Sequence, residues 1–290
     1  MGPLVSTEWL SAELGRENLI VFDATMYLPN EGRDGQTEYL RAHIPGALFF
    51  DIDLVADPDT DLPHMAPSQG RFSRLMTDFG VTNDTDVVFY DQKGLFSAAR
   101  GWWLMRLFGH DRVAVLDGGF PKWQREGRRI ASGEVAPTPA DRSFSCNYRA
   151  SLIRGLGDVM ANLETRRELV IDARPQGRFM GTTPEPRAGM RSGHIPGSQS
   201  LPATGVIALD NTLKPSDTLR ELFAHVGADG TRQVVTSCGS GVTASLLAFA
   251  MHVAGLPDAA VYDGSWTEWG GRPDTPVAGQ TGSDKDTTHP

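Results

Sequence analysis

A cysteine and two glycines stand at the point where a buried strand would pass into a buried helix. The apolar run Val234–Val235 leads to Cys238, and Gly239 and Gly241 precede an apolar helical pattern over residues 242–253. Glycines let the backbone curl closely, so consecutive amides can point inward before a helix N-terminus. Those amides and the helix dipole favour a thiolate, which is a nucleophile. A small buried cysteine at a strand end is the alternative that the residue alone leaves open.

The composition is that of an ordinary globular protein. The chain has 290 residues, of which 40% are hydrophobic and 22% charged, and its length favours two medium domains. The formal net charge of −9 argues against nucleic acid or an anionic membrane as a partner. Cysteine or histidine pairs at zinc spacing do not occur in the sequence, so we expect neither a metal nor another cofactor.

Cysteine usage and the termini bear on the compartment. Only Cys146 and Cys238 are present, which excludes a disulfide framework and suits a reducing cytosol. The N-terminus has no basic segment followed by an apolar core, and no stretch approaches the length of a membrane span. We therefore expect a cytoplasmic protein.

Short motifs occur twice in the same order and at a nearly constant spacing. Such a shift over more than a hundred residues indicates a duplication. The pairs are Val21–Ala24 with Val170–Ala173, Ala42–Gly46 with Gly193–Gly197, Asp86–Asp91 with Gln233–Cys238, Val115–Gly118 with Val261–Gly264, and Trp123 with Trp269.

Within each copy, short apolar strands alternate with helical segments. Strands that are apolar throughout and alternate with helices indicate a parallel sheet covered on both faces. We therefore predict an α/β protein of two tandem domains, each a small doubly wound parallel sheet with helices on both faces. The expected strands are 19–24, 87–90, 113–116, 169–173, 234–237 and 259–262, and the clearest helices are 97–107 and 242–253.

A segment without periodicity separates the two copies. It contains Pro137, Pro139 and several small polar residues, which are typical of a linker. We place the first domain at 5–130, the linker at 131–153 and the second domain at 154–278.

Ligands of parallel α/β sheets bind outside the carboxyl ends of the strands. Cys238 lies at such an end, and the matching position of the first copy is Asp91. The sequence therefore predicts a catalytic second domain and a non-catalytic first domain.

The repeated His-Ile-Pro-Gly at 43–46 and 194–197, together with Cys-Gly-Ser-Gly-Val-Thr at 238–243, resembles the two-domain rhodanese superfamily. The likeness covers about Val5 to Val277 and is closest to the 3-mercaptopyruvate sulfurtransferase branch. It implies two rhodanese-like domains and transfer of a sulfane sulfur from 3-mercaptopyruvate, through a Cys238 persulfide, to a thiol or cyanide, with release of pyruvate. Thioredoxin or another small thiol is the acceptor that the resemblance suggests.

The resemblance also assigns residues to the site. Cys238 matches the nucleophile, and Ser240 matches a serine that forms a relay with a histidine and an aspartate of the first domain, here His64 and Asp53. Arginine suits the donor carboxylate because a guanidinium donates two parallel hydrogen bonds. The remaining residues expected to bind substrate are Arg178, Arg187, Gly239, Gly241, Val242 and Thr243.

Other reactive residues have simpler interpretations. We expect Arg174 and Arg191 to form surface ion pairs or helix caps. His43 and His194 occur in both copies, including the one without a thiol, so we interpret them as structural. Cys146 lies near the linker without an activating feature and is also interpreted as structural.

Three other functions compete with this one. A thiosulfate sulfurtransferase of the same family carries cationic residues after the cysteine, whereas Gly239 and Ser240 are uncharged. A phosphatase of related fold needs Cys-x5-Arg, but the matching position is Ala244. A non-catalytic sulfur-binding or sensing module fits Asp91 in the first copy and is opposed by Cys238 in the second.

Overall fold

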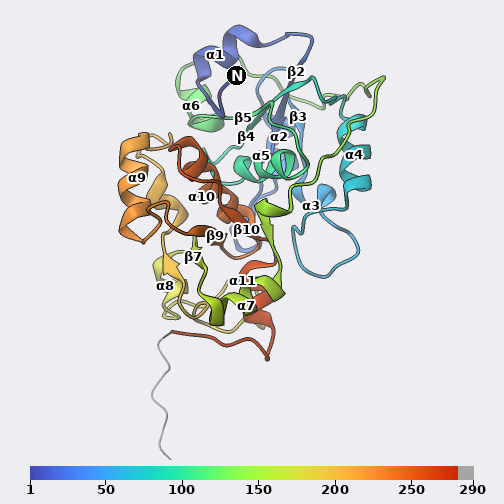
Figure 1. Cartoon of the computed structure of the whole chain (residues 1–290). Helices are drawn as coiled ribbons and strands as arrows, with labels where there is room; N and C mark the ends of the chain where they lie inside the picture. The colour runs from blue at the N-terminus through green and yellow to red at the C-terminus, as the bar shows by residue number, and fades with distance from the viewer. Residues whose placement is uncertain (280–290) are drawn as a thin grey trace, which may run out of the picture.

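The computed structural model of the chain describes residues 1–279 and contains two five-stranded sheets, one in each copy of the repeat (Figure 1). All strand pairings within the two sheets are parallel. The predicted α/β class with two doubly wound domains is therefore confirmed.

The first sheet has the strand order β1-β5-β4-β2-β3. Its strands are β1 (Leu4–Val5), β2 (Leu19–Asp23), β3 (Leu48–Phe49), β4 (Asp86–Tyr90) and β5 (Val113–Leu116). The helices of this domain are α1 (Thr7–Glu13), α2 (Gly35–Arg41), α3 (Ile52–Val55), α4 (Gln69–Asp78), α5 (Ala98–Leu107) and α6 (Gly119–Arg125), with a 3-10 turn η1 (Pro29–Glu31).

The second sheet has the strand order β6-β10-β9-β7-β8. Its strands are β6 (Ile153–Arg154), β7 (Glu168–Asp172), β8 (Gln199–Ser200), β9 (Gln233–Ser237) and β10 (Ala260–Tyr262). The helices are α7 (Leu156–Thr165), α8 (Gln176–Phe179), α9 (Ser216–His225), α10 (Val242–Val253) and α11 (Ser265–Gly271), with 3-10 turns η2 (Ala150–Leu152) and η3 (Ala203–Val206).

The two sheets repeat the same topology, as the paired motifs predict. The expected strands agree with β2, β4, β5, β7, β9 and β10 to within one residue at either end. The edge strands β1, β3, β6 and β8 have two residues each. The sequence does not reveal them because two residues carry no periodicity.

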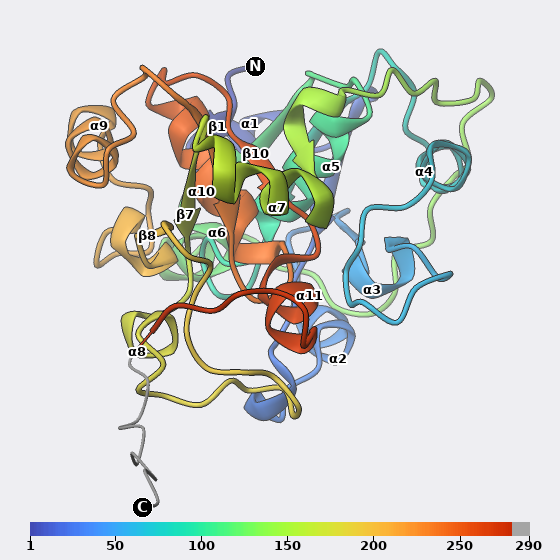
Figure 2. The same ribbon diagram turned by 60° about the horizontal axis from the view of Figure 1, so that its bottom comes forward.

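Helices cover both faces of each sheet. In the first domain, α1 and α6 pack on one face, and α4 and α5 pack on the other. In the second domain, α7 and α11 cover one face and lie in front of the sheet in the turned view (Figure 2), whereas α9 and α10 cover the other. This layering explains why the central strands are apolar at almost every position.

The domains meet through α5 and α10, which lie at the centre of the molecule (Figure 1). One continuous hydrophobic core includes residues of both helices and both sheets. Across this interface the rings of Trp102 and Phe249 pack edge to face with centroids 5.0 Å apart. The apolar contact holds the loops of the first domain over the carboxyl edge of the second sheet.

The most apolar helix is α10. Nine of its twelve residues are buried, because it packs against both its own sheet and the neighbouring domain. Its length remains that of a core helix: within residues 1–279, no helix has both the length and the apolar composition needed to cross a membrane.

The segment between the domains packs onto the first domain. Phe144 is buried against Phe72, with ring centroids 5.9 Å apart, and the Ala140 amide donates to the Thr77 carbonyl oxygen. At its end, Ile153 already pairs with Val261 in the second sheet. We keep residues 131–153 as the proposed connection between the domains 5–130 and 154–278.

Candidate active site

Cys238 follows β9 directly and is 2% exposed. The loop after it turns into α10 at Gly241, whose φ of 79° lies in the left-handed region. A Cβ on Gly241 would stand 2.9 Å from Arg100 Nη1 and 3.0 Å from the Asp263 carbonyl oxygen, so only glycine fits. Gly239, in contrast, has no left-handed φ, so its expected conformational role is not observed.

A serine that the sequence analysis missed organises the same loop. The Ser265 hydroxyl accepts hydrogen bonds from the amides of Cys238 and Gly241, each at 3.1 Å, and donates to the Tyr262 carbonyl oxygen at 2.7 Å. The Gly241 amide is thus engaged by Ser265, which corrects the expectation that it faces the sulfur. The repeat could have pointed to this residue, because Ser265 replaces Gly119 of the first copy and shares its left-handed φ.

The amides left for an anion lie at the start of α10. Val242 and Thr243 are the first two residues of that helix, and Gly239 and Ser240 precede it. First-turn amides have no acceptor within their own helix, so they are available to a thiolate or to an anionic ligand. The carbonyl oxygens of the loop are occupied: Cys238 accepts from the Trp266 amide at 2.9 Å, and Gly239 from Thr267 at 2.8 Å.

Asp53, His64 and Ser240 form a chain of contacts across the domain boundary. His64 Nδ1 lies 2.9 Å from Ser240 Oγ, and His64 Nε2 lies 3.1 Å from Asp53 Oδ1. The imidazole is buried, whereas the Asp53 side chain is 71% exposed. The hydrogen bond from His64 lowers the pKa of the Asp53 carboxyl. With Nε2–H donated to this carboxylate, Nδ1 accepts the proton of the Ser240 hydroxyl.

Arg100 holds His64 in place from the first domain. Its guanidinium is fully buried, forms an ion pair with Asp263 at 2.6 Å and donates to the His64 carbonyl oxygen. The other oxygen of Asp263 accepts from the Ala66 amide at 2.7 Å. Residues on both sides of the boundary are thereby tied together. An arginine inside a mostly apolar helix gives no sequence signal for such a tertiary contact.

Both predicted carboxylate-binding arginines line the cavity at Cys238. Arg178 on α8 pairs with Glu185, with Nε 3.0 Å from Oε2. For Arg187, the structure records no acidic partner within 4.0 Å among residues 1–279, and burial lowers the pKa of its guanidinium. A Cβ on Gly239 would lie 3.3 Å from Arg178 Nη2, so the arginine approaches the loop backbone closely.

The expectation that Arg174 lies on the surface is wrong. Arg174 is 1% exposed, forms ion pairs with Asp172 at 2.6 Å and Glu185 at 2.7 Å, and stacks on Trp266 at 4.1 Å. Glu185 therefore bridges Arg174 and Arg178. The buried ion pairs extend from the sheet to Arg178, which fixes the direction of its guanidinium.

The remaining residues have structural contacts. Arg191 donates to the carbonyl oxygens of Trp269 and Gly270 at the end of α11, as a helix cap does. The ring of His43 stacks on Tyr39 and that of His194 on Phe179, each with Nδ1 at a backbone carbonyl oxygen. Burial raises the pKa of Cys146 to about 11, which makes it a poor thiolate.

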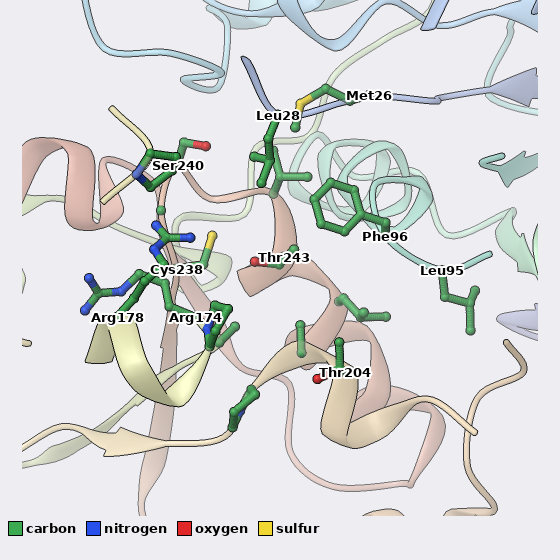
Figure 3. Close-up of a pocket in the computed structure, with 18 of the residues that line it drawn as sticks. Met26, Leu28, Leu95, Phe96, Arg174, Arg178, Thr204, Cys238, Ser240 and Thr243 are labelled. Atoms are coloured by element: carbon green, nitrogen blue, oxygen red, sulfur yellow. The ribbon is translucent and has the colours of Figure 1, made fainter. Parts of the chain in front are cut away.

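A cavity of about 150 Å³ between the domains is lined by Cys238 and Ser240 together with Arg178 and Arg187. In Figure 3, Cys238, Ser240, Arg174 and Arg178 lie on one side of it, and Phe96 lies opposite. Within the described part of the chain, no group of three or more His, Cys, Asp or Glu side chains is placed to hold a metal ion.

Known proteins match this chain over most of its length. The rhodanese-like domain family matches residues 6–126 and 156–272. Human 3-mercaptopyruvate sulfurtransferase is 41% identical, with 92% of this chain and 91% of the relative aligned. Bovine thiosulfate sulfurtransferase is 42% identical, with 92% of this chain and 91% of the relative aligned. The crystal structure of SseA from Escherichia coli, a 3-mercaptopyruvate sulfotransferase, superposes with a TM-score of 0.82 at 34% identity, covering 92% of this chain and 99% of that one. The chain therefore belongs to the rhodanese-like domain family and carries two copies of its domain.

Proposed function

We propose that this sulfurtransferase takes a sulfane sulfur from 3-mercaptopyruvate onto Cys238 and passes it to a thiol or to cyanide. One observation carries the proposal: a cysteine at the N-terminus of a helix shares a cavity with two arginines, Arg178 and Arg187. A nucleophilic sulfur and two guanidiniums on the same side of a small cavity suit a short 2-oxo acid that bears a thiol.

The donor half-reaction follows from this geometry. The Cys238 thiolate attacks the donor sulfur, a sulfur–sulfur bond forms, and the bond between sulfur and C3 of the donor breaks. Its electron pair leaves as the enolate of pyruvate, which takes up the proton that the donor thiol gives up. Cys238 is left as a persulfide, and the amides at the start of α10 stabilise its negative charge.

Each neighbouring residue has a proposed part in that step. Arg178 and Arg187 bind the carboxylate and orient the donor. With the donor bound, the Ser240 hydroxyl exchanges its hydrogen bond to His64 Nδ1 for one to the donor carbonyl oxygen, which strengthens as the enolate develops. Asp53 fixes the imidazole by accepting from Nε2. Gly239, Val242 and Thr243 contribute backbone amides, and Gly241 provides the turn that aims them.

Thiosulfate is the second candidate donor, since the bovine relative named for it is as similar as the human one. Thiosulfate is a dianion, which favours cations beside the nucleophile. The loop residues Gly239 and Ser240 are uncharged, and the nearest guanidiniums belong to Arg178 and Arg187. This distribution of charge favours the carboxylate donor.

Kinetics with both donors on one preparation tests the proposal. We expect a higher kcat/KM for 3-mercaptopyruvate than for thiosulfate. The mass of the intact protein should increase by one sulfur atom after treatment with 3-mercaptopyruvate, and cyanide should remove it. An enzyme that prefers thiosulfate, or one that gains no sulfur, contradicts the proposed donor.

The compartment and the natural acceptor belong to the proposal as well. Both cysteines are free thiols, which supports the cytoplasm as the compartment. A thiol such as thioredoxin or a smaller molecule is the proposed acceptor. Cell fractionation and a comparison of acceptors test these two points.

A further inference from the structure

The cavity at Cys238 is charged on one side and apolar on the other. Opposite the arginines, its wall consists of Met26, Leu28 and Phe96 from the first domain and Ile207 and Leu246 from the second. Figure 3 shows Leu28, Met26 and Phe96 across the cavity from Arg174 and Arg178, with Thr243 between the two groups. We call Met26, Leu28, Phe96, Ile207 and Leu246 the apolar wall.

The first-domain part of the apolar wall is held rigidly. The Phe96 amide donates to Asp91 at 2.8 Å, and Lys93 Nζ lies 3.8 Å from the centroid of the Phe96 ring. Lys93 is itself paired with Glu31 at 2.7 Å. Leu95, beside Phe96, is 1% exposed and anchors the loop in the core. The loop that carries no thiol thus presents an ordered aromatic ring to the active site of the other domain.

Met26 and Leu28, the other first-domain residues of the apolar wall, are also held by hydrogen bonds. The Met26 amide donates to Ser97 Oγ at 3.2 Å, and the Leu28 amide donates to Glu31 at 2.6 Å. Glu31 therefore contacts both Leu28 and the lysine that covers Phe96. These hydrogen bonds fix the backbone on which the apolar side chains stand, so the wall is a built surface.

The proposed donor leaves this surface unused. 3-Mercaptopyruvate has one methylene group between a thiol and a carbonyl, and its carboxylate is directed to the arginines. Burying apolar side chains against such a molecule stabilises it little, because the driving force is proportional to the apolar area removed from water. The apolar wall therefore fits the second substrate of the reaction better than the first.

We propose that the apolar wall binds the sulfur acceptor, and that the preferred acceptors are small thiols with an aliphatic or aromatic substituent. The proposal rests on the proposed function. The acceptor thiolate attacks the outer sulfur of the Cys238 persulfide, a new sulfur–sulfur bond forms in the product persulfide, and the bond to Cys238 breaks. Its electron pair returns to Cys238 as the thiolate, so the step needs no other oxidant or reductant.

Discharge of a preformed persulfide isolates this step. The enzyme is charged with 3-mercaptopyruvate in one sample and with inorganic polysulfide in another, freed of excess reagent, and mixed with 2-mercaptoethanol or benzyl mercaptan, two thiols of similar pKa. We expect benzyl mercaptan to discharge Cys238 with a second-order rate constant about tenfold higher, since its ring is buried against the wall. Failure to charge with 3-mercaptopyruvate alone would count against the donor, while the polysulfide sample still tests the acceptor.

Variants of the apolar wall test whether the preference for benzyl mercaptan comes from contact with this wall. In Leu28→Ala and in Phe96→Ala, the preference for benzyl mercaptan should fall to about threefold or less, because apolar contact area is lost. Leu40→Ala is the matched control, since Leu40 is an exposed leucine of α2 outside the cavity, and it should keep the full preference. Circular dichroism checks that each variant is folded.

Three results would overturn the inference. The first is a wild type that discharges both thiols at rates within about twofold, which leaves no apolar selectivity to explain. The second is a preference that neither Leu28→Ala nor Phe96→Ala reduces. The third is an equal reduction in Leu40→Ala, which would show that the preference does not arise at the wall.

Discussion

Seven residues connect β4 to α5, whereas four connect β9 to α10. In the longer loop, one oxygen of Asp91 accepts from the amides of Phe96, Ser97 and Ala98 at 2.8 to 2.9 Å, and the other accepts from Lys93 at 2.9 Å. The first domain thus fills its amide-lined turn with its own carboxylate. The second places a thiol there and keeps the amides at the start of α10 for the sulfur chemistry.

Asp172 and Asp23 are a second pair of equivalent residues, and they differ in the charge of the side chains that bind them. Asp172 at the end of β7 is paired with Arg174, which leads through Glu185 to Arg178. Its counterpart Asp23 at the end of β2 has the neutral partners Thr25 and Gln92. The repeat therefore keeps a carboxyl group at the end of this strand in both domains, but only in the second do ion pairs lead from it to an arginine proposed to bind substrate.

The largest effect is expected where the two loops differ in their nucleophile. Cys238→Ser should abolish sulfur transfer, because a hydroxyl cannot form the persulfide. Cys146→Ser is the matched control and should retain most turnover, since Cys146 lies outside the cavity and has a raised pKa. Steady-state rates with 3-mercaptopyruvate measure both. Turnover that survives in Cys238→Ser would refute the whole assignment.

Removing the carboxylate of the first loop should cost stability. Asp91→Ala leaves four amides without their acceptor, two of them buried and two partly buried, so we expect the free energy of unfolding to fall by about 4 kcal/mol. Asp91→Asn keeps one oxygen and should lose less. Asp91→Cys should form no persulfide, because the first loop lacks the arginines of the second. Urea unfolding and intact mass test these points, and a second sulfur on Asp91→Cys would show that the loops are interchangeable.

The carboxyl of Asp23, whose hydrogen-bond partners are neutral, predicts a dependence of stability on pH. Burial raises its pKa from 3.8 to about 6, so the folded protein binds more protons than the unfolded chain between these values. The free energy of unfolding should therefore fall as pH rises through that window, by up to about 3 kcal/mol from this group. Asp23→Asn should remove that contribution in urea titrations across the window. A difference between variant and wild type that stays constant with pH would contradict it.

The two arginines proposed to bind the donor carboxylate should differ in importance. Arg178 shares its charge with Glu185, whereas Arg187 has no acidic partner recorded within the described residues. Both substitutions to alanine should lower kcat/KM for 3-mercaptopyruvate by about tenfold to a hundredfold, the equivalent of about 1.5–3 kcal/mol, with Arg187→Ala at the upper end. Changes below about twofold in both variants would place the carboxylate elsewhere.

The sequence predicts the parts of the molecule that local pattern and repetition determine. Short apolar runs predict the strands β4 and β9, and the motif at Cys238 identifies the loop and, through the family resemblance, its distant partners. The sequence cannot predict the ion pair of Arg100 with Asp263 or the burial of Arg174, because the fold alone brings their partners together. The repeat singles out Ser265 as a replacement of glycine, but its hydrogen bond to the Gly241 amide is seen only in the folded structure. These contacts depend on tertiary geometry, which spacing does not encode.

The smallest effect concerns the choice between donors, and it depends on the charge of the second loop. Thiosulfate stays dianionic when its outer sulfur is attacked, so cations beside Cys238 should favour it, whereas 3-mercaptopyruvate uses the hydroxyl of Ser240. Gly239→Arg combined with Ser240→Lys supplies those cations and removes that hydroxyl.

Gly239 is not in the left-handed region, so the backbone accepts a side chain there, and the nearest obstacle is the guanidinium of Arg178 at 3.3 Å. We expect the ratio of kcat/KM for thiosulfate to that for 3-mercaptopyruvate to rise about fivefold, or ~1 kcal/mol. Repulsion from Arg178 and Arg187 keeps the effect small. Ser240→Ala is the control, because it removes the hydroxyl without adding charge. If it moves the ratio as far as the double variant does, the hydroxyl and not the charge of the loop selects the donor.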